Sequence, residues 1–283
     1  MKYGIKMRKI KILCDGGLGN RLGVLIGGLI TGEKINAEPI IYWPENSWCG
    51  CAFDDLFDTE LNFINEDINT LFKNNIDNLF MIHENQTNLT LKKIYVHSER
   101  NVDILSKLND DIVYYNHSIP SYYNKSKIIE TLSSIKIKES IVNEVLNFCK
   151  QNNIDENTDG VHFRKTDFTM GINEDKIFKF MISNMDKKYY ICSDDKETED
   201  RFRKLKNVIS YQKTSYVEKL KDGSWNEPTT DLEGRTFNYN VNRPKQSVIE
   251  AFIDLLILSR TNILVNSLST FLTFAKYYSK IKL

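Results

Sequence analysis

The sequence lacks the features that mark several large classes of protein. No apolar run approaches the length of a membrane-spanning helix, and residues 15–17 interrupt the apolar stretch behind the basic N-terminus before it reaches the length of a signal-peptide core. Neither sign of charge is in excess, because 38 lysines and arginines balance 38 aspartates and glutamates. This balance gives no support for nucleic-acid binding or for a polybasic membrane surface. We therefore expect a cytoplasmic protein with no transmembrane segment and no nucleic-acid partner.

Metal-binding and disulfide-forming residues are also scarce. The five cysteines are an odd, scattered set, and Cys49 and Cys51 lack the C-x-x-C spacing of redox and zinc sites. The four histidines form no H-E-x-x-H motif and no cluster with cysteine. The D-x-D pattern with which many metal-dependent transferases bind their ion is absent as well. These absences predict a reduced compartment and no dedicated metal site.

The chain does have enough apolar and aromatic residues for buried cores. Of its 283 residues 41% are hydrophobic, and 15 phenylalanines and 14 tyrosines add large rings. This composition predicts a folded globular protein rather than a disordered one. A chain of this length forms one large domain or two of ordinary size.

Strand-like and helix-like segments alternate in both halves of the chain. In the first half, a strand at residues 9–14 leads through a glycine turn to a helix with apolar residues at helical spacing from Leu22, and a second strand follows at 39–43. In the second half, strands are expected around Gly160 and at 188–192, 207–212 and 262–266, with helices between them. This alternation predicts an α/β fold with parallel, doubly wound sheets.

The division into domains follows from the polar, non-periodic residues 152–159, which are the candidate linker. We predict two Rossmann-like domains, residues 1–155 and 156–283. Residues 213–245 are too long for an ordinary connection, which favours a functional loop. The region from about residue 52 to 155 is harder to assign, and its clearest segments are a helix at 139–150 and strands at 79–82, 93–96 and 112–115.

The most informative motif is H-x-R-x-T-D at residues 162–167. Side chains alternate along a strand, so His162 and Arg164 point to the same side, where a parallel strand presents its ligand-binding loop. The planar guanidinium of Arg164 donates to two oxygens at once and keeps its charge, which suits a diphosphate. A purely structural ion pair between Arg164 and Asp167 explains the pattern equally well.

Three further segments combine polar residues with the ends of strands. The glycine turn at residues 16–20 opens a helix as a phosphate-binding loop does, although a turn needed only for strand-to-helix geometry explains it too. Asp194 and Asp195 end an apolar strand, where they face a ligand or cap the next helix. Ser269 and Thr270 open the last helix, as an anion site or as an ordinary cap.

Asp254 interrupts an otherwise apolar helix. A buried carboxylate needs hydrogen-bond donors, which a purine edge, a backbone group or Arg260 would supply. Two Rossmann-like halves, an arginine and a helix start directed at phosphate, and no metal together predict a nucleotide-sugar site between two domains.

In four blocks the chain resembles the fucosyltransferase superfamily that contains core alpha-1,6-fucosyltransferases, bacterial nodulation fucosyltransferases and protein O-fucosyltransferases. The second block is similar to the H-x-R-R-T-D motif of the alpha-1,6 branch, with Lys165 in place of the second arginine. The four blocks are residues 16–21, 160–167, 193–195 and 254–270.

This resemblance implies a GT-B-like fold, in which two Rossmann-like doubly wound domains face each other across a cleft. The N-terminal domain would bind the acceptor and the C-terminal domain the donor. The implied activity is that of an inverting glycosyltransferase that moves fucose from GDP-fucose to a hydroxyl of a glycan, with no metal and no cofactor. Its partners would be a nucleotide sugar and a glycan acceptor.

The resemblance also implies roles for individual residues. Arg164 would hold the β-phosphate and stabilise the departing GDP, as a metal cation does in other transferases. His162 and Asp254 would hold guanine, and Asn20 matches an asparagine near the diphosphate in protein O-fucosyltransferases. The predicted catalytic residues are Arg164, Asp167 and Glu174, and the predicted donor-binding residues are Gly17, Gly19, Asn20, Arg21, His162, Asp194, Asp195, Asp254, Ser269 and Thr270.

The chain departs from the family where the general base is expected. After the motif, the alpha-1,6 enzymes carry a lysine and then a glutamate implicated in accepting the acceptor's proton, where this chain has Phe168 and Ile172. Glu174 and Asp175 follow, so the base, the linkage and the acceptor stay open. The alternatives are a transferase that uses another GDP-sugar and a catalytically silent glycan-binding protein. Lack of the helical stalk and SH3-like tail of animal core enzymes favours a bacterial or viral origin.

Overall fold

The computed structural model describes residues 8–65, 112–114, 123–167, 173–230, 236–237, 239–264 and 269–283. The chain divides into two compact units, one of Met1–Glu45 with Ala52–Lys136 and one of Asn46–Cys51 with Ile137–Leu283. The second unit begins at Ile137 rather than at residue 156, because helix α6 (Glu139–Asn152) packs on helix α9 (Lys245–Leu258). Residues 152–159, the candidate linker, therefore lie within this unit.

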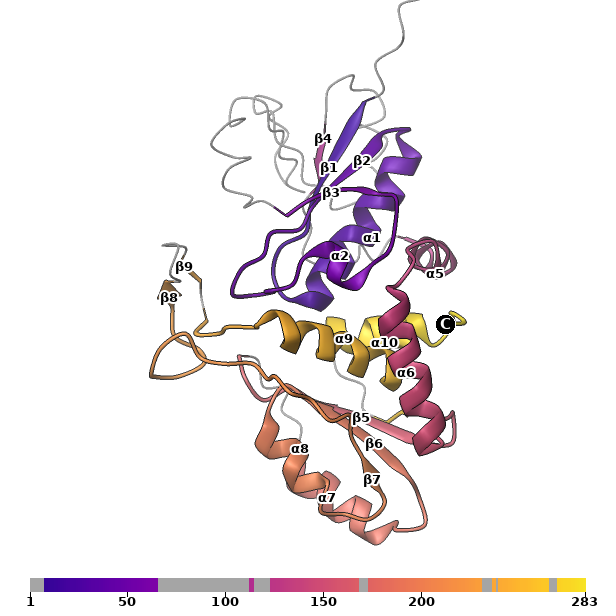
Figure 1. Ribbon diagram of the computed structural model, residues 1–283, viewed down its shortest axis with the longest axis vertical. Coiled ribbons are helices and arrows are strands. Elements are labelled where there is room, and N and C mark those ends of the chain that lie inside the picture. The colour runs from indigo at the N-terminus through magenta and orange to yellow at the C-terminus, as the bar shows by residue number, and fades with distance from the viewer. Residues whose placement is uncertain are drawn as a thin grey trace, which may run out of the picture. The chain divides into compact units, whose positions relative to one another are not determined.

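The first unit is built on a four-stranded parallel sheet with the order β3-β2-β1-β4 (Figure 1). The predicted strand–helix–strand unit at its start is confirmed, and the strand expected at 112–115 is β4. The segments expected at 79–82 and 93–96 lie outside the described residues. The elements are β1 (Lys9–Leu13), α1 (Leu18–Lys34), β2 (Glu38–Tyr42), α2 (Phe53–Leu56), β3 (Asn62–Ile64), β4 (Ile112–Tyr114) and α5 (Lys125–Ser133).

Helix α1 lies close against β1 because two glycines face the strand. A methyl group on Gly28 would be 2.6 Å from Cγ2 of Ile12, and one on Gly32 would be 2.9 Å from Cγ2 of Ile10. Both isoleucines are fully buried. This close packing fixes the start of α1, and with it the glycine turn, at the carboxyl end of β1.

The second unit contains a second four-stranded parallel sheet, with the order β10-β5-β6-β7, and a short antiparallel hairpin (Figure 1). The prediction of an α/β fold with parallel sheets is confirmed. The elements that follow α6 are β5 (Asp159–Phe163), α7 (Glu174–Ser183), β6 (Tyr189–Ser193), α8 (Lys196–Phe202), β7 (Val208–Ile209), the hairpin strands β8 (Thr229–Thr230) and β9 (Thr236–Phe237), α9, β10 (Asn262–Ile263) and α10 (Thr270–Tyr278).

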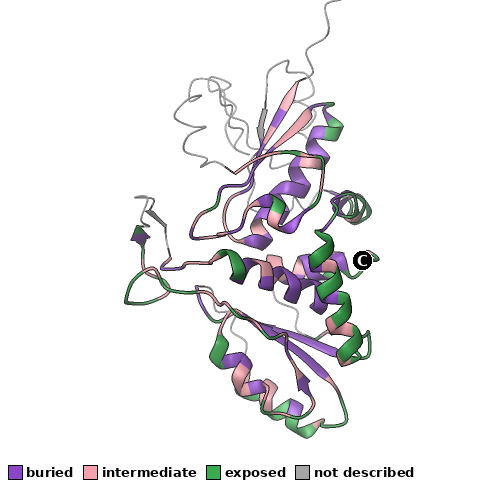
Figure 2. Cartoon of the chain, viewed as in Figure 1, coloured by how far each residue is buried: buried purple, intermediate pink, exposed green. Residues whose placement is uncertain are grey.

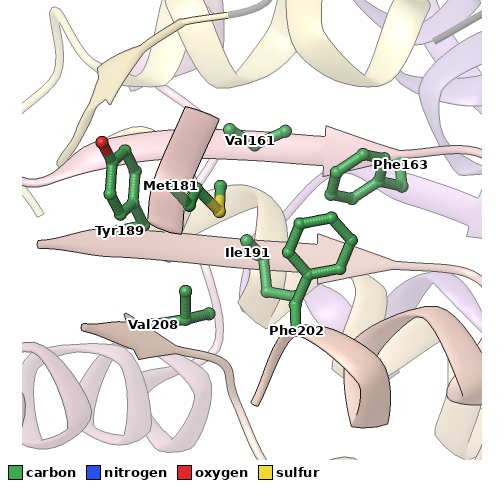
Figure 3. Packing of buried hydrophobic residues seen from close by; sticks show 7 residues of the cluster. All are labelled: Val161, Phe163, Met181, Tyr189, Ile191, Phe202 and Val208. Atoms are coloured by element: carbon green, nitrogen blue, oxygen red, sulfur yellow. The ribbon is translucent and has the colours of Figure 1, made fainter. Parts of the chain in front are cut away.

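Strands β5 and β6 are buried on both faces, as central strands of a parallel sheet are (Figure 2). Alternate residues face α7 and α8, where Val161 and Phe163 join Tyr189 and Ile191 in one apolar cluster with Met181, Phe202 and Val208 (Figure 3). The residues between them, among them His162 and Tyr190, face the helices on the other side. The sheet is therefore covered on both faces, by α7 and α8 on one side and by α9 and α10 on the other.

The long connection at 213–245 is fastened near both of its ends. Glu250 on α9 accepts the backbone N–H groups of Thr214 and Ser215 at 2.9–3.0 Å. At the other end, the backbone N–H of Arg243 donates to Ser47 at 2.9 Å. The strand expected at 207–212 is shorter than predicted, because the chain turns after Ile209 toward these anchors on α9.

Candidate functional site

Arg164 follows directly on β5, and its loop is held by Asp194 from the end of β6. One Asp194 oxygen accepts the backbone N–H of Lys165 at 2.7 Å, and the other accepts the Thr166 hydroxyl at 2.6 Å. Asp195 instead accepts a backbone N–H in the first turn of α8, at 2.8 Å. In the structure, Asp194 thus fixes the arginine loop, whereas Asp195 caps a helix.

Two arginines share the buried carboxylate of Asp167. Nη2 of Arg164 donates to one oxygen at 2.9 Å, and Nη2 of Arg243 donates to the other at 2.8 Å. Burial alone would raise the pKa of Asp167, but the charges of Arg243 and Arg164 hold that pKa below its ordinary value. Because both oxygens are occupied, Asp167 is placed to orient the arginines rather than to accept a proton. The Arg164 side chain keeps 26% of its surface exposed.

His162 lies one residue before the end of β5, stacked on Phe271 of α10. The ring centroids are 4.4 Å apart and the planes differ by 18°. Burial, with the charges of Arg164 and Lys213, lowers the pKa of His162 to about 3, so the imidazole is neutral at physiological pH. No residue in the described part of the chain hydrogen-bonds its ring nitrogens. A neutral imidazole offers a ligand one donor and one acceptor.

The start of α10 lies beside this ring, because Phe271 belongs to its first turn. Ser269 is the N-cap residue and is 4% exposed, yet its hydroxyl has no hydrogen-bond partner among the described residues. A buried hydroxyl without a partner is unusual in a native protein. The structure thus brings together two predicted donor-binding positions, His162 and the Ser269–Thr270 helix start.

Asp254 is enclosed by partners from its own unit. Its oxygens accept the Tyr190 hydroxyl at 2.6 Å and Nζ of Lys213 at 2.8 Å, and Lys213 also pairs with the buried Glu199 at 2.6 Å. Burial raises the pKa of the Asp254 carboxyl, and Lys213 opposes that rise. These donors satisfy the carboxylate without Arg260, a backbone group or a purine. The predicted guanine contact of Asp254 therefore has no unused oxygen to draw on in this arrangement.

Glu174 opens α7 and is paired with two cations. Its carboxylate lies 2.8 Å from Nζ of Lys165 and 3.3 Å from Nη1 of Arg201, and Arg201 also pairs with Asp175. The contact with Lys165 joins the arginine loop to α7. The structure thus places Glu174 next to the motif, as the prediction requires, but with its charge compensated.

In the first unit, Arg21 is fully buried beneath the glycine turn. It donates from Nε to the carbonyl of Gly16 and from Nη1 to that of Pro44, both at 2.7 Å, and its guanidinium lies 5.2 Å from the centre of the Trp43 ring. These contacts connect the turn after β1 with the chain after β2. Arg21, predicted to bind the donor, is placed to hold the turn instead of a ligand.

The turn itself leaves room at its tip. Gly16 has φ of +80°, a conformation that favours glycine, and a methyl group on Gly17 would meet nothing within 4 Å. Gly17 is the N-cap of α1, Gly19 is buried in the first turn, and Asn20 beside it is half-buried. Backbone N–H groups at such a helix start are suited to an anion.

Sequence reasoning missed the residues that organise this region from a distance. Arg243, Lys213 and Glu199 all lie outside the recognisable motifs, and Arg243 stands 76 residues after Asp167. No sequence pattern indicates that Glu199, a carboxylate, is fully buried.

Within the described residues, no group of three or more His, Cys, Asp or Glu side chains is arranged to hold a metal ion. None of the helices described is both long and apolar enough to cross a membrane.

No family model matches the chain, and no curated protein matches it in sequence. Solved structures do match. Fucosyltransferase NodZ from Bradyrhizobium aligns over 96% of this chain and 92% of its own, with a TM-score of 0.59 and 14% identity. Arabidopsis thaliana FUT1 covers 98% and 69%, with a TM-score of 0.56 and 14% identity. POFUT1 in complex with GDP covers 96% of each chain, with a TM-score of 0.52 and 11% identity.

The chain has the fold of these fucosyltransferases. The resemblance predicted from four short sequence blocks is confirmed at the level of the fold. At 10–14% identity, as in these matches, the fold is what the likeness establishes.

Proposed function

We propose that the chain is an inverting, metal-independent glycosyltransferase of GT-B type that moves fucose from GDP-fucose to a hydroxyl of a glycan. The observation that carries this proposal is the partly exposed Arg164 at the carboxyl end of a buried central parallel strand, where open α/β sheets bind their ligands. The shared fold supports the choice of donor, because structures of NodZ and POFUT1 include complexes with GDP or GDP-fucose.

In this proposal the donor lies at the carboxyl ends of the strands of the second sheet. Arg164 binds the β-phosphate, and the Ser269 hydroxyl, with the Thr270 end of α10, binds phosphate oxygens. The neutral ring of His162 forms hydrogen bonds to guanine. Asn20, Gly17 and Gly19 contribute backbone and amide groups near the diphosphate. Asp254 and Arg21 act by holding the surrounding chain, as their contacts favour.

The chemistry is a single displacement at the anomeric carbon. The acceptor oxygen forms the new glycosidic bond as the bond to the β-phosphate oxygen breaks, and GDP leaves with the electron pair. Arg164 stabilises the charge that develops on the leaving phosphate, where many transferases use a metal ion. A base takes the proton of the acceptor hydroxyl, and Glu174 is its candidate.

Exchange of two neighbouring acids tests this base. A Glu174→Gln variant should lower kcat by about 10²-fold with little change in KM, since it removes a group that accepts the proton in the transition state. Asp175→Asn is the matched control, and it should leave kcat near that of the wild type, because Asp175 is an exposed partner of the same arginine. Equal rates in the wild type and both variants would exclude Glu174 as the base.

Binding calorimetry in EDTA separates the proposal from its alternatives. We expect GDP and GDP-fucose to bind and UDP not to bind. If GDP bound tightly and another GDP-sugar were the better substrate, the proposed sugar would change but the proposed GDP site would be retained. Binding of GDP with no turnover on any glycan would favour the catalytically silent reading, and preference for UDP or a need for Mn²⁺ would overturn the proposal.

A further inference from the structure

The charges around Asp167 do not cancel. Arg164 and Asp167 alone would form a neutral pair, and a neutral pair attracts a diphosphate weakly. Arg243 binds the second oxygen of the same carboxylate, so the cluster holds two positive charges against one negative charge. These three groups together carry a net charge of +1, and of the two arginines Arg164 is the more exposed, at 26%.

Arg243 is itself held rigidly by residues from the other half of the sequence. Its backbone N–H donates to Ser47, and its carbonyl accepts the N–H of Gly50, both at 2.9 Å. A methyl group on Gly50 would be 2.6 Å from that carbonyl oxygen, so only glycine permits this approach. The Arg243 guanidinium lies 5.4 Å from the centre of the Trp48 ring, a favourable distance for a cation–π contact.

The side chain of Arg243 is more enclosed than that of Arg164. It is 13% exposed, against 26% for Arg164, and its Nη1 is buried with no hydrogen-bond partner among the described residues. Its polar contact within the site is Asp167. The role open to it is therefore to act through that carboxylate.

We propose that Arg243 is a positioning residue that binds and compensates Asp167, so that Arg164 keeps a net positive charge and a fixed orientation toward the diphosphate. The last step rests on the function proposed above. Loss of Arg243 leaves the Asp167 carboxylate with Arg164 and the Thr166 hydroxyl. The charge of Arg164 is then balanced by Asp167, and the carboxylate that orients it has lost one of its two cationic partners.

Titration of Asp167 tests the pairing without any donor. The carboxyl ¹³C resonance of Asp167, assigned with Asp167→Asn, is followed against pH in the wild type and in Arg243→Gln. The groups that face Asp167 are Arg164, Arg243 and the Thr166 hydroxyl, and Asp194 lies beyond Thr166. Since the charge of Arg243 is the largest of the causes that lower the pKa of Asp167, its loss should raise that pKa. An unchanged titration would overturn the inference.

Activity tests the effect on Arg164. Arg243→Gln should lower kcat/KM for GDP-fucose on the order of 10²-fold, since a small displacement of a clamping group has effects of this size. Because protonation of Asp167 removes the same charge as Asp167→Asn, the loss in Arg243→Gln should shrink as the pH falls through the pKa of Asp167. The double variant Asp167→Asn, Arg243→Gln removes one charge of each sign and restores the net +1, so it should recover about tenfold over Arg243→Gln. A double variant no better than the single one would contradict the charge argument.

Arg203→Gln is the matched control. Arg203 is also a partly buried arginine of the second unit that binds two carboxylates, Glu199 at 2.9 Å and Asp200 at 2.7 Å. It should lower thermal stability while leaving the titration of Asp167 unchanged. If Arg203→Gln moved the titration of Asp167 as far as Arg243→Gln does, Arg243 would have only a general structural role.

The outcomes also separate this inference from the proposed function. If the wild type bound no GDP but the pKa of Asp167 shifted in Arg243→Gln, the proposed function would be rejected and the pairing of Arg243 with Asp167 would be retained. If GDP bound and fucose were transferred while Arg243→Gln changed neither the titration of Asp167 nor the rate of transfer, the proposed function would be retained and the role of Arg243 would be rejected.

Discussion

Arg21 and Arg164 each follow a central parallel strand, one in each compact unit, and are held in opposite ways. Arg21 is fully buried, and two of its nitrogens donate to backbone carbonyls of Gly16 and Pro44. Arg164 binds a carboxylate that a second arginine shares, and a quarter of its side chain stays accessible. The Arg21 guanidinium thus fixes a turn through backbone carbonyls, whereas the Arg164 guanidinium is held through a carboxylate and is partly exposed.

The largest expected effect concerns Arg164. We predict that Arg164→Ala lowers the rate of fucose transfer by about 10²–10³-fold, the range observed when a group that stabilises developing negative charge is removed. Arg164→Lys should recover little, because a lysine lacks the fork that binds two oxygens. Initial rates at saturating GDP-fucose give the comparison. A rate within a few-fold of the wild type in Arg164→Ala would remove Arg164 from the chemistry.

The next effect concerns Arg21 and appears in stability. Arg21→Met keeps most of the side-chain volume but leaves two carbonyl oxygens unpaired, so the free energy of unfolding should fall on the order of 3 kcal/mol. Arg164→Met should change it far less, because Arg164 is partly exposed and leaves Asp167 with Arg243. Urea unfolding of both variants measures the difference. The comparison fails if Arg164→Met proves the less stable of the two.

The sequence predicted what local patterns encode. Apolar runs such as residues 189–192 identified central strands, and the glycine turn identified the start of α1 within a few residues. The H-x-R-x-T-D spacing placed Arg164 and Asp167 correctly at the end of β5, because strand geometry fixes which side chains share a face.

The partners of these residues were not predictable from local patterns. Arg243 reaches Asp167 only because the turn at residues 46–51 belongs to the second unit and holds its backbone. A purine, a backbone group or Arg260 was expected to bind Asp254, yet Lys213 and Tyr190 bind it from distant parts of the chain. Such contacts depend on tertiary packing, which periodicity and spacing do not encode.

The smallest effect separates two glycines, Gly160 within β5 and Gly17 at the start of α1. A methyl group on Gly160 would be 2.0 Å from Oγ1 of Thr261 and 2.7 Å from Cδ1 of Leu258, so Gly160→Ala should destabilise the protein by about 1–3 kcal/mol. Gly17→Ser, at an open helix start, should stay within about 0.5 kcal/mol of the wild type. If Gly17 approaches the diphosphate, its serine variant should still bind GDP more weakly. The unfolding midpoints and GDP affinities of the two variants then distinguish two roles, as they do for Arg21 and Arg164. Gly160 permits packing, and Gly17 permits the approach of a ligand.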